Sequence, residues 1–204
     1  MPMHKLFPSL VLQDKVQSPS SKLHRELLQE SYKFREIDKL GQAWSKKNYP
    51  GGYTSYGSLA TMYDISPTFN ELRLKIDKVV HQYIRDLDMD VKPKDIQMCS
   101  LWINIMPAKV THTMHIHPLS VISGSFYVQV PKGTSCFKLE DPRLVGFMAS
   151  PPRRAKAKKD NQRFIELSPK AGEVVLFESW LRHEVPANPI AKDRVSISFN
   201  YHWV

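Results

Sequence analysis

The sequence is poor in cysteine, in long apolar runs and in acidic residues, and each shortage excludes a class of protein. Its two cysteines, Cys99 and Cys136, form no CxxC pair and cannot build the disulfide framework of a small secreted domain. The apolar stretch VVLF at 174–177 is far shorter than the ~18 residues of a membrane span. The N-terminal segment MPMHKLFPSL lacks the apolar run and cleavage site of a signal peptide. We therefore expect a cytoplasmic protein with free thiols and no membrane partner.

Acidic residues are outnumbered, with 20 Asp and Glu against 29 Lys and Arg, so the net charge is +9. A basic surface attracts anions, and the excess is concentrated in PPRRAKAKKD at 151–160. This run favours a solvated loop, with a patch that binds an acidic partner as the alternative. It contains no aromatic residue, whereas a groove for single-stranded nucleic acid interleaves aromatic and basic side chains. Nucleic acid is therefore not an expected partner.

The first part of the chain, 1–95, predicts a helical support within a single domain over 1–204. Either Ser20 or Ser21 can cap a predicted helix over roughly 21–35. Residues 36–58, which include KKNYPGGYTSYGS, lack periodicity and predict a loop that is one candidate for contacting substrate. Ser66-Pro67 then begins a second helix, whose apolar residues recur every three or four positions.

From about residue 97 the apolar period changes to two, which indicates strands. Short segments rich in β-branched and aromatic residues are separated by turn signals with Pro, Gly and Asp. They are CSLWINIM (99–106), VISGSFYVQV (121–130), TSCFKLE (134–140), RFIELS (163–168), EVVLFE (173–178) and RVSISFNYHW (194–203). The number and spacing of these strands predict a mainly β (α+β) fold. We expect a jelly roll, or double-stranded β-helix, over 96–204 with helices packed on one outer face.

Histidines supply the first candidate site, because His112, His115 and His117 lie close together in the sequence. If 115 and 117 lie on one strand, their side chains share a face, since successive residues alternate. His183 follows the apolar segment EVVLFE, on the turn that leads out of a strand. Three imidazoles from distant strands would bind a transition metal and leave coordination positions open. The alternative is a set of polar residues at strand edges.

Arg194 and Ser196 supply a second candidate site, because they share a face of a predicted strand while Val195 and Ile197 take the other. A guanidinium and a hydroxyl inside a barrel must find polar partners. A carboxylate satisfies both, because the guanidinium fork binds it through two hydrogen bonds. The pair predicts a carboxylate-binding site, unless the arginine faces solvent at the start of its strand.

Together these motifs resemble the 2-oxoglutarate/iron(II)-dependent oxygenases on a double-stranded β-helix, and in particular the family with an HxHP motif. The likeness covers nearly the whole chain, and 169–200 is its most specific part. The similar segments are LFPS near the start, GGYTS (51–55), LWIN (101–104), HIHPLSVISGSFYVQVP (115–131), EDPR (140–143), PKAGEVVLFESWLRHEVPAN (169–188) and DRVSISFN (193–200).

The resemblance implies that His115 and His183 are iron ligands and that position 117 holds the third. Most members of the superfamily have Asp or Glu there, whereas this sequence has His117. Neutral imidazole also suits iron(II), and Asp141, Glu184 or a water is the alternative ligand. By the same resemblance, Arg194 and Ser196 would bind the distal carboxylate of 2-oxoglutarate, and Asn104 and Tyr127 would hydrogen-bond this cosubstrate. His112 and Trp180 would contact the ligands, and for His112 the alternatives are a metal ligand or a histidine at the rim of the site. An apolar lining of the site could come from Trp102, Phe126, Phe177 and Trp180, with the hydrophobic core as the alternative for most of them.

The function implied is that of an iron(II)-, 2-oxoglutarate- and O2-dependent oxygenase that hydroxylates an unidentified substrate and releases succinate and CO2. The substrate would be a small molecule or a peptide, and the basic loop at 151–160 favours an anionic one. Two alternatives remain open. The missing carboxylate at 117 is consistent with a three-histidine, cupin-type metal dioxygenase that does not use 2-oxoglutarate. The basic surface is consistent with a non-catalytic binding module on the same fold.

Overall fold

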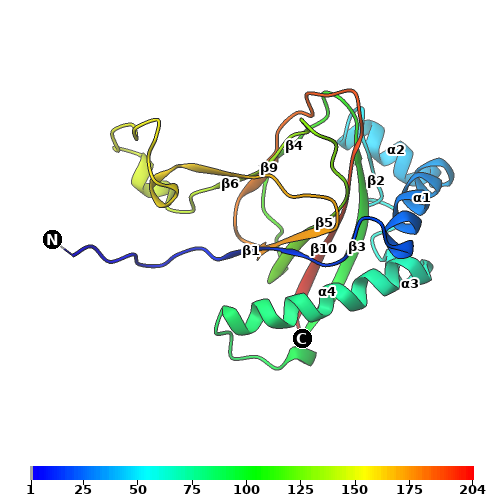
Figure 1. Ribbon diagram of the computed structural model, residues 1–204, viewed down its shortest axis with the longest axis horizontal. Helices are drawn as coiled ribbons and strands as arrows, with labels where there is room; N and C mark the ends of the chain where they lie inside the picture. Colours follow the sequence, from blue (N-terminus) through cyan, green and yellow to red (C-terminus); the bar gives the residue numbers. More distant parts are fainter. Residues whose placement is uncertain (1) are drawn as a thin grey trace.

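The computed structural model describes residues 2–204, without the side chains of residues 145 and 147, and consists of two antiparallel sheets with helices against the larger one (Figure 1). The six-stranded sheet has the order β1-β8-β5-β10-β3-β2, and the four-stranded sheet has the order β4-β9-β6-β7. The strands are β1 Val11–Lys15, β2 Tyr53–Thr54, β3 Ile96–Met106, β4 His112–His115, β5 Ile122–Gln129, β6 Phe137–Glu140, β7 Phe164–Leu167, β8 Glu173–Glu178, β9 His183–Val185 and β10 Arg194–Trp203. The helices are α1 Lys22–Ile37, α2 Lys39–Asn48, α3 Met62–Ile65 and α4 Pro67–Asp86, with short 3-10 turns at Pro93–Asp95, Leu144–Phe147 and Lys159–Asn161. The jelly-roll prediction is confirmed.

Both predicted helices are present, and both begin at the expected caps. The Ser21 hydroxyl accepts from the His24 N–H at 3.1 Å, and the Ser66 hydroxyl accepts from the Phe69 N–H at 3.4 Å. Buried apolar residues of α1 and α4 belong to one core with the outer face of the six-stranded sheet. The helices therefore cover one face of that sheet, as the sequence predicts, and leave its other face for the site (Figure 1).

The loop predicted over 36–58 is wrong for its first part, which forms α2. This helix buries only Gly41 and Ser45 and so has no apolar stripe for a periodicity argument to detect. Its N-cap is Asp38, whose carboxylate accepts from the Gly41 N–H at 2.8 Å and from the Tyr53 hydroxyl at 2.9 Å. The second bond comes from outside the helix, which is why local sequence did not predict α2.

Strand β10 lies inside the large sheet, between β3 and β5, and its side chains alternate between the two faces of that sheet. Its residues Val195, Ile197 and Phe199 are buried in the core beneath the helices. Arg194 and Ser196, with Ser198 and Asn200 beyond them, line a cavity on the opposite face. The predicted alternation along this strand is therefore present, and it places Arg194 and Ser196 on the face that lines the cavity.

A basic lobe, defined here as residues 141–163, connects β6 to β7 and projects away from the two sheets (Figure 1). The N-terminal segment runs beside it, and Lys5 pairs with Asp160 at 2.5 Å. Cys99 and Cys136 are free. Within residues 2–204, none of the helices is both long and apolar enough to cross a membrane.

Candidate functional site

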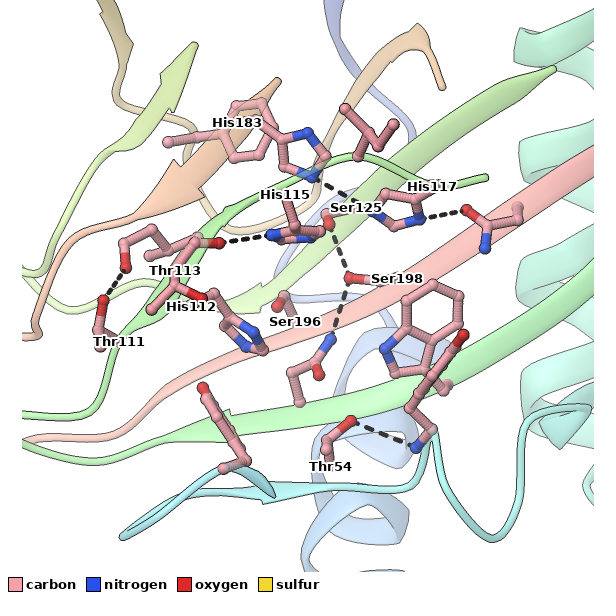
Figure 2. Close-up of a pocket in the computed structure, with 18 of the residues that line it drawn as sticks. Thr54, Thr111, His112, Thr113, His115, His117, Ser125, His183, Ser196 and Ser198 are labelled. Atoms are coloured by element: carbon pink, nitrogen blue, oxygen red, sulfur yellow. Dashed lines mark hydrogen bonds between the residues drawn. The ribbon is translucent and has the colours of Figure 1, made fainter. Parts of the chain in front are cut away.

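Three histidines meet between the two sheets (Figure 2). His115 is the last residue of β4, His183 is the first of β9, and His117 lies just beyond β4. One ring nitrogen from each lies within 4.8 Å of the others. Ring centroids are 4.3 Å apart for His115 and His183, and 5.1 Å for each pair that includes His117. His183 is the most buried of the three, and His115 is the most exposed. The structure thus brings together the histidines that the sequence singles out.

The local geometry of two of these histidines differs from the prediction. β4 ends at His115, so His117 does not share its strand, and the argument from strand alternation is wrong for this residue. His117 is held instead by its backbone N–H, which donates to the Ser179 carbonyl at 3.0 Å. The predicted turn at His183 is also wrong, because this residue begins β9 and pairs with His115 across the small sheet.

Each of the three rings has an oxygen acceptor at Nδ1. Nδ1 of His115 lies 2.6 Å from the Thr113 carbonyl, Nδ1 of His183 lies 2.8 Å from the Leu181 carbonyl, and Nδ1 of His117 lies 2.7 Å from Oδ1 of Asn200. An oxygen acceptor there requires the proton on Nδ1, which leaves the lone pair on Nε2. The Nε2 atoms of His117 and His183 are only 3.2 Å apart. Two facing lone pairs repel unless a cation lies between them, so this donor set fits a metal ion.

Electrostatics favour the neutral, metal-binding form of these rings. Burial, and after it the neighbouring His115, lowers the pKa of His117 to about 4 and that of His183 to about 3. Both rings are therefore uncharged near neutral pH. The two alternative carboxylate ligands lie elsewhere, since Asp141 pairs with Arg143 at 2.6 Å and Glu184 pairs with Lys138 at 2.8 Å.

Asn200 was missed by the sequence analysis, although it contacts His117. Its Oδ1 also accepts from the Ser123 hydroxyl at 2.8 Å, and Ser123 in turn contacts Ser179 at 2.7 Å. This buried chain fixes the amide so that its oxygen faces the imidazole. The available signal was the alternation of β10, which puts Asn200 on the same face as Arg194.

The histidines open into a cavity of about 400 Å³ between the sheets. Among the described residues, those that line it include no Asp or Glu, and Arg194 is its one arginine or lysine. Arg194 is only 3% exposed and, within the described part of the chain, forms no ion pair with a carboxylate. Its Nε has no hydrogen-bond partner. A buried guanidinium without an anion is costly, so the cavity fits a ligand that carries a carboxylate.

The other predicted cosubstrate residues lie around this guanidinium. Ser196 lies on the same face of β10 as Arg194 and also lines the cavity. The Nδ2 of Asn104, on β3, donates to the Ser198 hydroxyl at 3.0 Å, and the Oδ1 of Asn104 has no partner among the described residues. The Arg194 Cζ lies 5.0 Å from the centre of the Tyr127 ring. Burial raises the pKa of Tyr127 to about 12, and the guanidinium opposes this rise.

The remaining predicted residues divide between the cavity and the rest of the fold. His112 lines the cavity and stacks on Tyr49, with ring centroids 4.2 Å apart. Trp102 and Phe177 also line it, as do Trp44 and Tyr56 from the N-terminal half. Phe126 is instead buried beneath the helices, and Trp180 is 47% exposed outside the cavity lining. Of the four candidate lining residues, Phe126 therefore belongs to the core, which was the alternative, and Trp180 belongs neither to the lining nor to the core.

Comparison with known proteins points to one kind of chemistry. Residues 100–200 match the family described as "Putative 2OG-Fe(II) oxygenase". Among solved structures, the epimerase SnoN from nogalamycin biosynthesis, in complex with Fe3+, alpha-ketoglutarate and nogalamycin RO, has a TM-score of 0.65 and 13% identity, covering 95% of this chain and 79% of its own. HygX from Streptomyces hygroscopicus, with nickel and 2-oxoglutarate bound, has a TM-score of 0.64 and 14% identity, with coverage of 96% and 84%. A Pseudomonas putida prolyl-4-hydroxylase has a TM-score of 0.60 and 13% identity, with coverage of 96% and 94%. No curated protein matches the chain in sequence.

Proposed function

Through residues 100–200 the chain belongs to the 2OG-Fe(II) oxygenase family, and on that premise we propose which of its residues serve that chemistry. The protein is an oxygenase that uses iron(II), 2-oxoglutarate and O2. His115, His117 and His183 bind the metal, and Arg194 binds the distal carboxylate of 2-oxoglutarate. The observation that carries this proposal is the convergence of one ring nitrogen from each of three histidines in the same cavity as a buried guanidinium without a carboxylate partner among the described residues.

The ligand set has three neutral imidazoles and no carboxylate, which suits iron(II). Bound iron supplies the redox chemistry that couples decarboxylation of 2-oxoglutarate to oxidation of a substrate C–H bond. The residues of the chain supply geometry. The Thr113 and Leu181 carbonyls and the Asn200 amide hold the three rings in the tautomer that binds metal.

Arg194 and Ser196 would orient the cosubstrate from the far end of the cavity. The guanidinium fork gives the carboxylate two parallel hydrogen bonds, and the Ser196 hydroxyl adds a third. Asn104 and Tyr127 would assist from neighbouring strands. Because the site is buried, these polar contacts act with little competition from water. The family match favours this arrangement over a cupin-type dioxygenase without 2-oxoglutarate and over a non-catalytic module.

The substrate would occupy the aromatic side of the cavity, beside His117. The Trp102 ring lies 6.0 Å from His117 and 5.0 Å from Tyr56, which in turn lies 6.1 Å from Trp44. These rings exclude water and accept an uncharged, carbon-rich group. The absence of acidic residues among the described lining, together with the net charge of +9, favours a neutral or anionic small molecule or peptide that is hydroxylated there.

The first prediction tests Arg194. The substitution Arg194→Ala should leave metal binding intact but weaken 2-oxoglutarate binding at least about 100-fold, because one partner of a buried charge pair is lost. Metal content, 2-oxoglutarate titration of the metal-loaded protein and succinate formation measure these effects. Arg143→Ala, in the exposed basic lobe, is the control and should behave as the wild type. Undiminished succinate formation by Arg194→Ala would refute the assignment.

A further inference from the structure

Tyr49 contributes to the cavity from outside the segment that matches the family. It follows α2, and its backbone N–H donates to the Ser45 carbonyl at 2.7 Å. Its ring is 5% exposed and stacks on His112, with an interplanar angle of 27°. On the other side it joins a buried apolar cluster that includes Met106, Val110 and Tyr127. The ring is thus fixed between the candidate metal site and the small-sheet side of the core.

The Tyr49 hydroxyl is the part of this residue that packing does not explain. It is buried and has no hydrogen-bond partner among the described residues. Tyr49 and Arg194 line the same cavity, and Tyr49 belongs to the same buried cluster as Tyr127, whose ring centre lies 5.0 Å from the Arg194 Cζ. Burial raises the pKa of Tyr49, and the positive charge of Arg194 opposes this rise. A buried, unpaired hydroxyl destabilises a protein unless a ligand supplies its partner.

The neighbouring backbone holds Tyr49 in one position. The Gly52 N–H donates to the Tyr49 carbonyl at 3.0 Å. A Cβ on Gly52 would lie 2.3 Å from Cε1 of the Tyr49 ring, so only glycine allows the ring to lie there. Gly51 has a φ of +84°, a conformation that favours glycine. The GG pair in the sequence therefore serves to place this ring against the cavity.

We propose that Tyr49 is a cosubstrate-binding residue, whose hydroxyl donates a hydrogen bond to the distal carboxylate of 2-oxoglutarate beside Arg194. This inference rests on the proposed function, because it requires 2-oxoglutarate to bind at Arg194. It gives the unpaired hydroxyl a partner. It also makes the helical half of the chain a contributor to cosubstrate binding, which the match over residues 100–200 does not include.

The test compares Tyr49→Phe with Tyr83→Phe by titrating 2-oxoglutarate into zinc-loaded protein and measuring heat release. Tyr83 on α4 is as buried as Tyr49, but it does not line the cavity and its hydroxyl donates to the Leu10 carbonyl at 2.7 Å, so it is a matched control. A hydrogen bond to a charged acceptor contributes enough that Tyr49→Phe should raise the Kd about tenfold or more. Tyr83→Phe should leave the Kd unchanged, because this residue is not part of the cavity lining.

Thermal unfolding of the same variants separates this role from a structural one. Without 2-oxoglutarate, Tyr49→Phe should unfold at the wild-type temperature or above it, because an unpaired buried hydroxyl is removed. With 2-oxoglutarate, its thermal shift should be smaller than that of the wild type.

Three outcomes would overturn the inference. A wild-type protein that fails to bind 2-oxoglutarate would refute the proposed function and this inference with it. A wild-type Kd in Tyr49→Phe would refute the inference and leave the oxygenase assignment standing. Equal weakening of 2-oxoglutarate binding in Tyr49→Phe and Tyr83→Phe would mean that the loss of any buried tyrosine hydroxyl has this effect, and would also refute the inference.

Discussion

His117 reaches the histidine cluster from outside any strand, and a side chain on β10 holds its ring. The amide oxygen of Asn200 accepts from Nδ1 of His117 at 2.7 Å, and Ser123 fixes the amide from the other side. His115 and His183 use backbone carbonyls for the same purpose. Of the three candidate ligands, His117 is therefore the one whose orientation a single side-chain substitution can disturb.

We expect Asn200→Ala to weaken zinc binding about 10- to 100-fold, the usual effect of removing a partner that orients a ligand. Competition with a chelator measures this affinity. Asn200→Asp retains an oxygen acceptor for Nδ1 and should restore most of it. Wild-type zinc affinity in Asn200→Ala would contradict the role assigned to this amide.

At this scale the sequence identified residues whose chemistry is conspicuous. His115, His117 and His183, and the Arg194–Ser196 pair, could be chosen because clustered imidazoles and an inward arginine have few structural uses. Asn200 could not be chosen, since an asparagine in a strand is common, and Tyr49 could be chosen only as part of the loop 36–58 that was a candidate for contacting substrate. Their roles depend on which atoms they meet across the fold.

Helix α1 is attached to the large sheet partly through His24, whose Nε2 lies 2.7 Å from the Val128 carbonyl of β5. Its other ring nitrogen, Nδ1, is buried without a partner among the described residues. A second proton would place a charge at that nitrogen, and burial accordingly lowers the pKa of His24. The contact between α1 and β5 is therefore strongest when His24 is neutral.

This arrangement predicts a pH dependence of stability. The unfolded chain has the higher His24 pKa and binds the proton first, so the free energy of unfolding should fall as pH drops below the ordinary histidine pKa of about 6.5. His24→Gln keeps an N–H donor but does not titrate, so its free energy of unfolding should fall less steeply with decreasing pH than that of the wild type. Denaturant unfolding at several pH values, with saturating zinc to occupy the histidine cluster, measures the difference. His4→Gln, at an exposed histidine, is the control. If the free energy of unfolding changed equally with pH in His24→Gln and in the wild type, the prediction would be contradicted.

Among the helices and strands, the number of residues in each determined whether the sequence could predict it. α4 and β10 carry enough residues for their periods of about 3.6 and two to be read. The strands β2 and β9 have 2 and 3 residues, too few for any period, and exist because neighbouring strands pair with them. The helix α2 depends on contacts of Asp38 with residues that follow it.

Across the whole molecule, α1 and α4 cover one face of the large sheet and the cavity lies on the other, where α2 adds Trp44 to the lining (Figures 1 and 2). The strand count and spacing predicted a jelly roll, because two sheets are needed to bury so many short amphipathic strands. The order of strands within each sheet could not be read, since it is set by contacts between residues far apart in the chain.

The basic lobe lies apart from the cavity, and none of the described lining residues comes from positions 138–176. Replacing residues 142–162 by a short glycine–serine turn would keep the antiparallel pairing of β6 and β7. We expect this deletion to leave the Kd for 2-oxoglutarate within about twofold of the wild-type value, because substitutions far from a site have little effect on it. Calorimetric titration measures this, and a large loss of binding would mean that the lobe contributes to the site.

A cluster made only of imidazoles also limits how the protein chooses its metal. Nitrogen donors of this kind bind divalent ions in the order Fe²⁺ below Co²⁺, Ni²⁺ and Cu²⁺, with Zn²⁺ also above Fe²⁺. With no oxygen ligand in the described cluster to favour a harder ion, affinity alone ranks iron behind its competitors. The supply of metals in the cell, rather than selectivity of the protein, would then decide how many molecules carry iron and how many are held inactive by zinc.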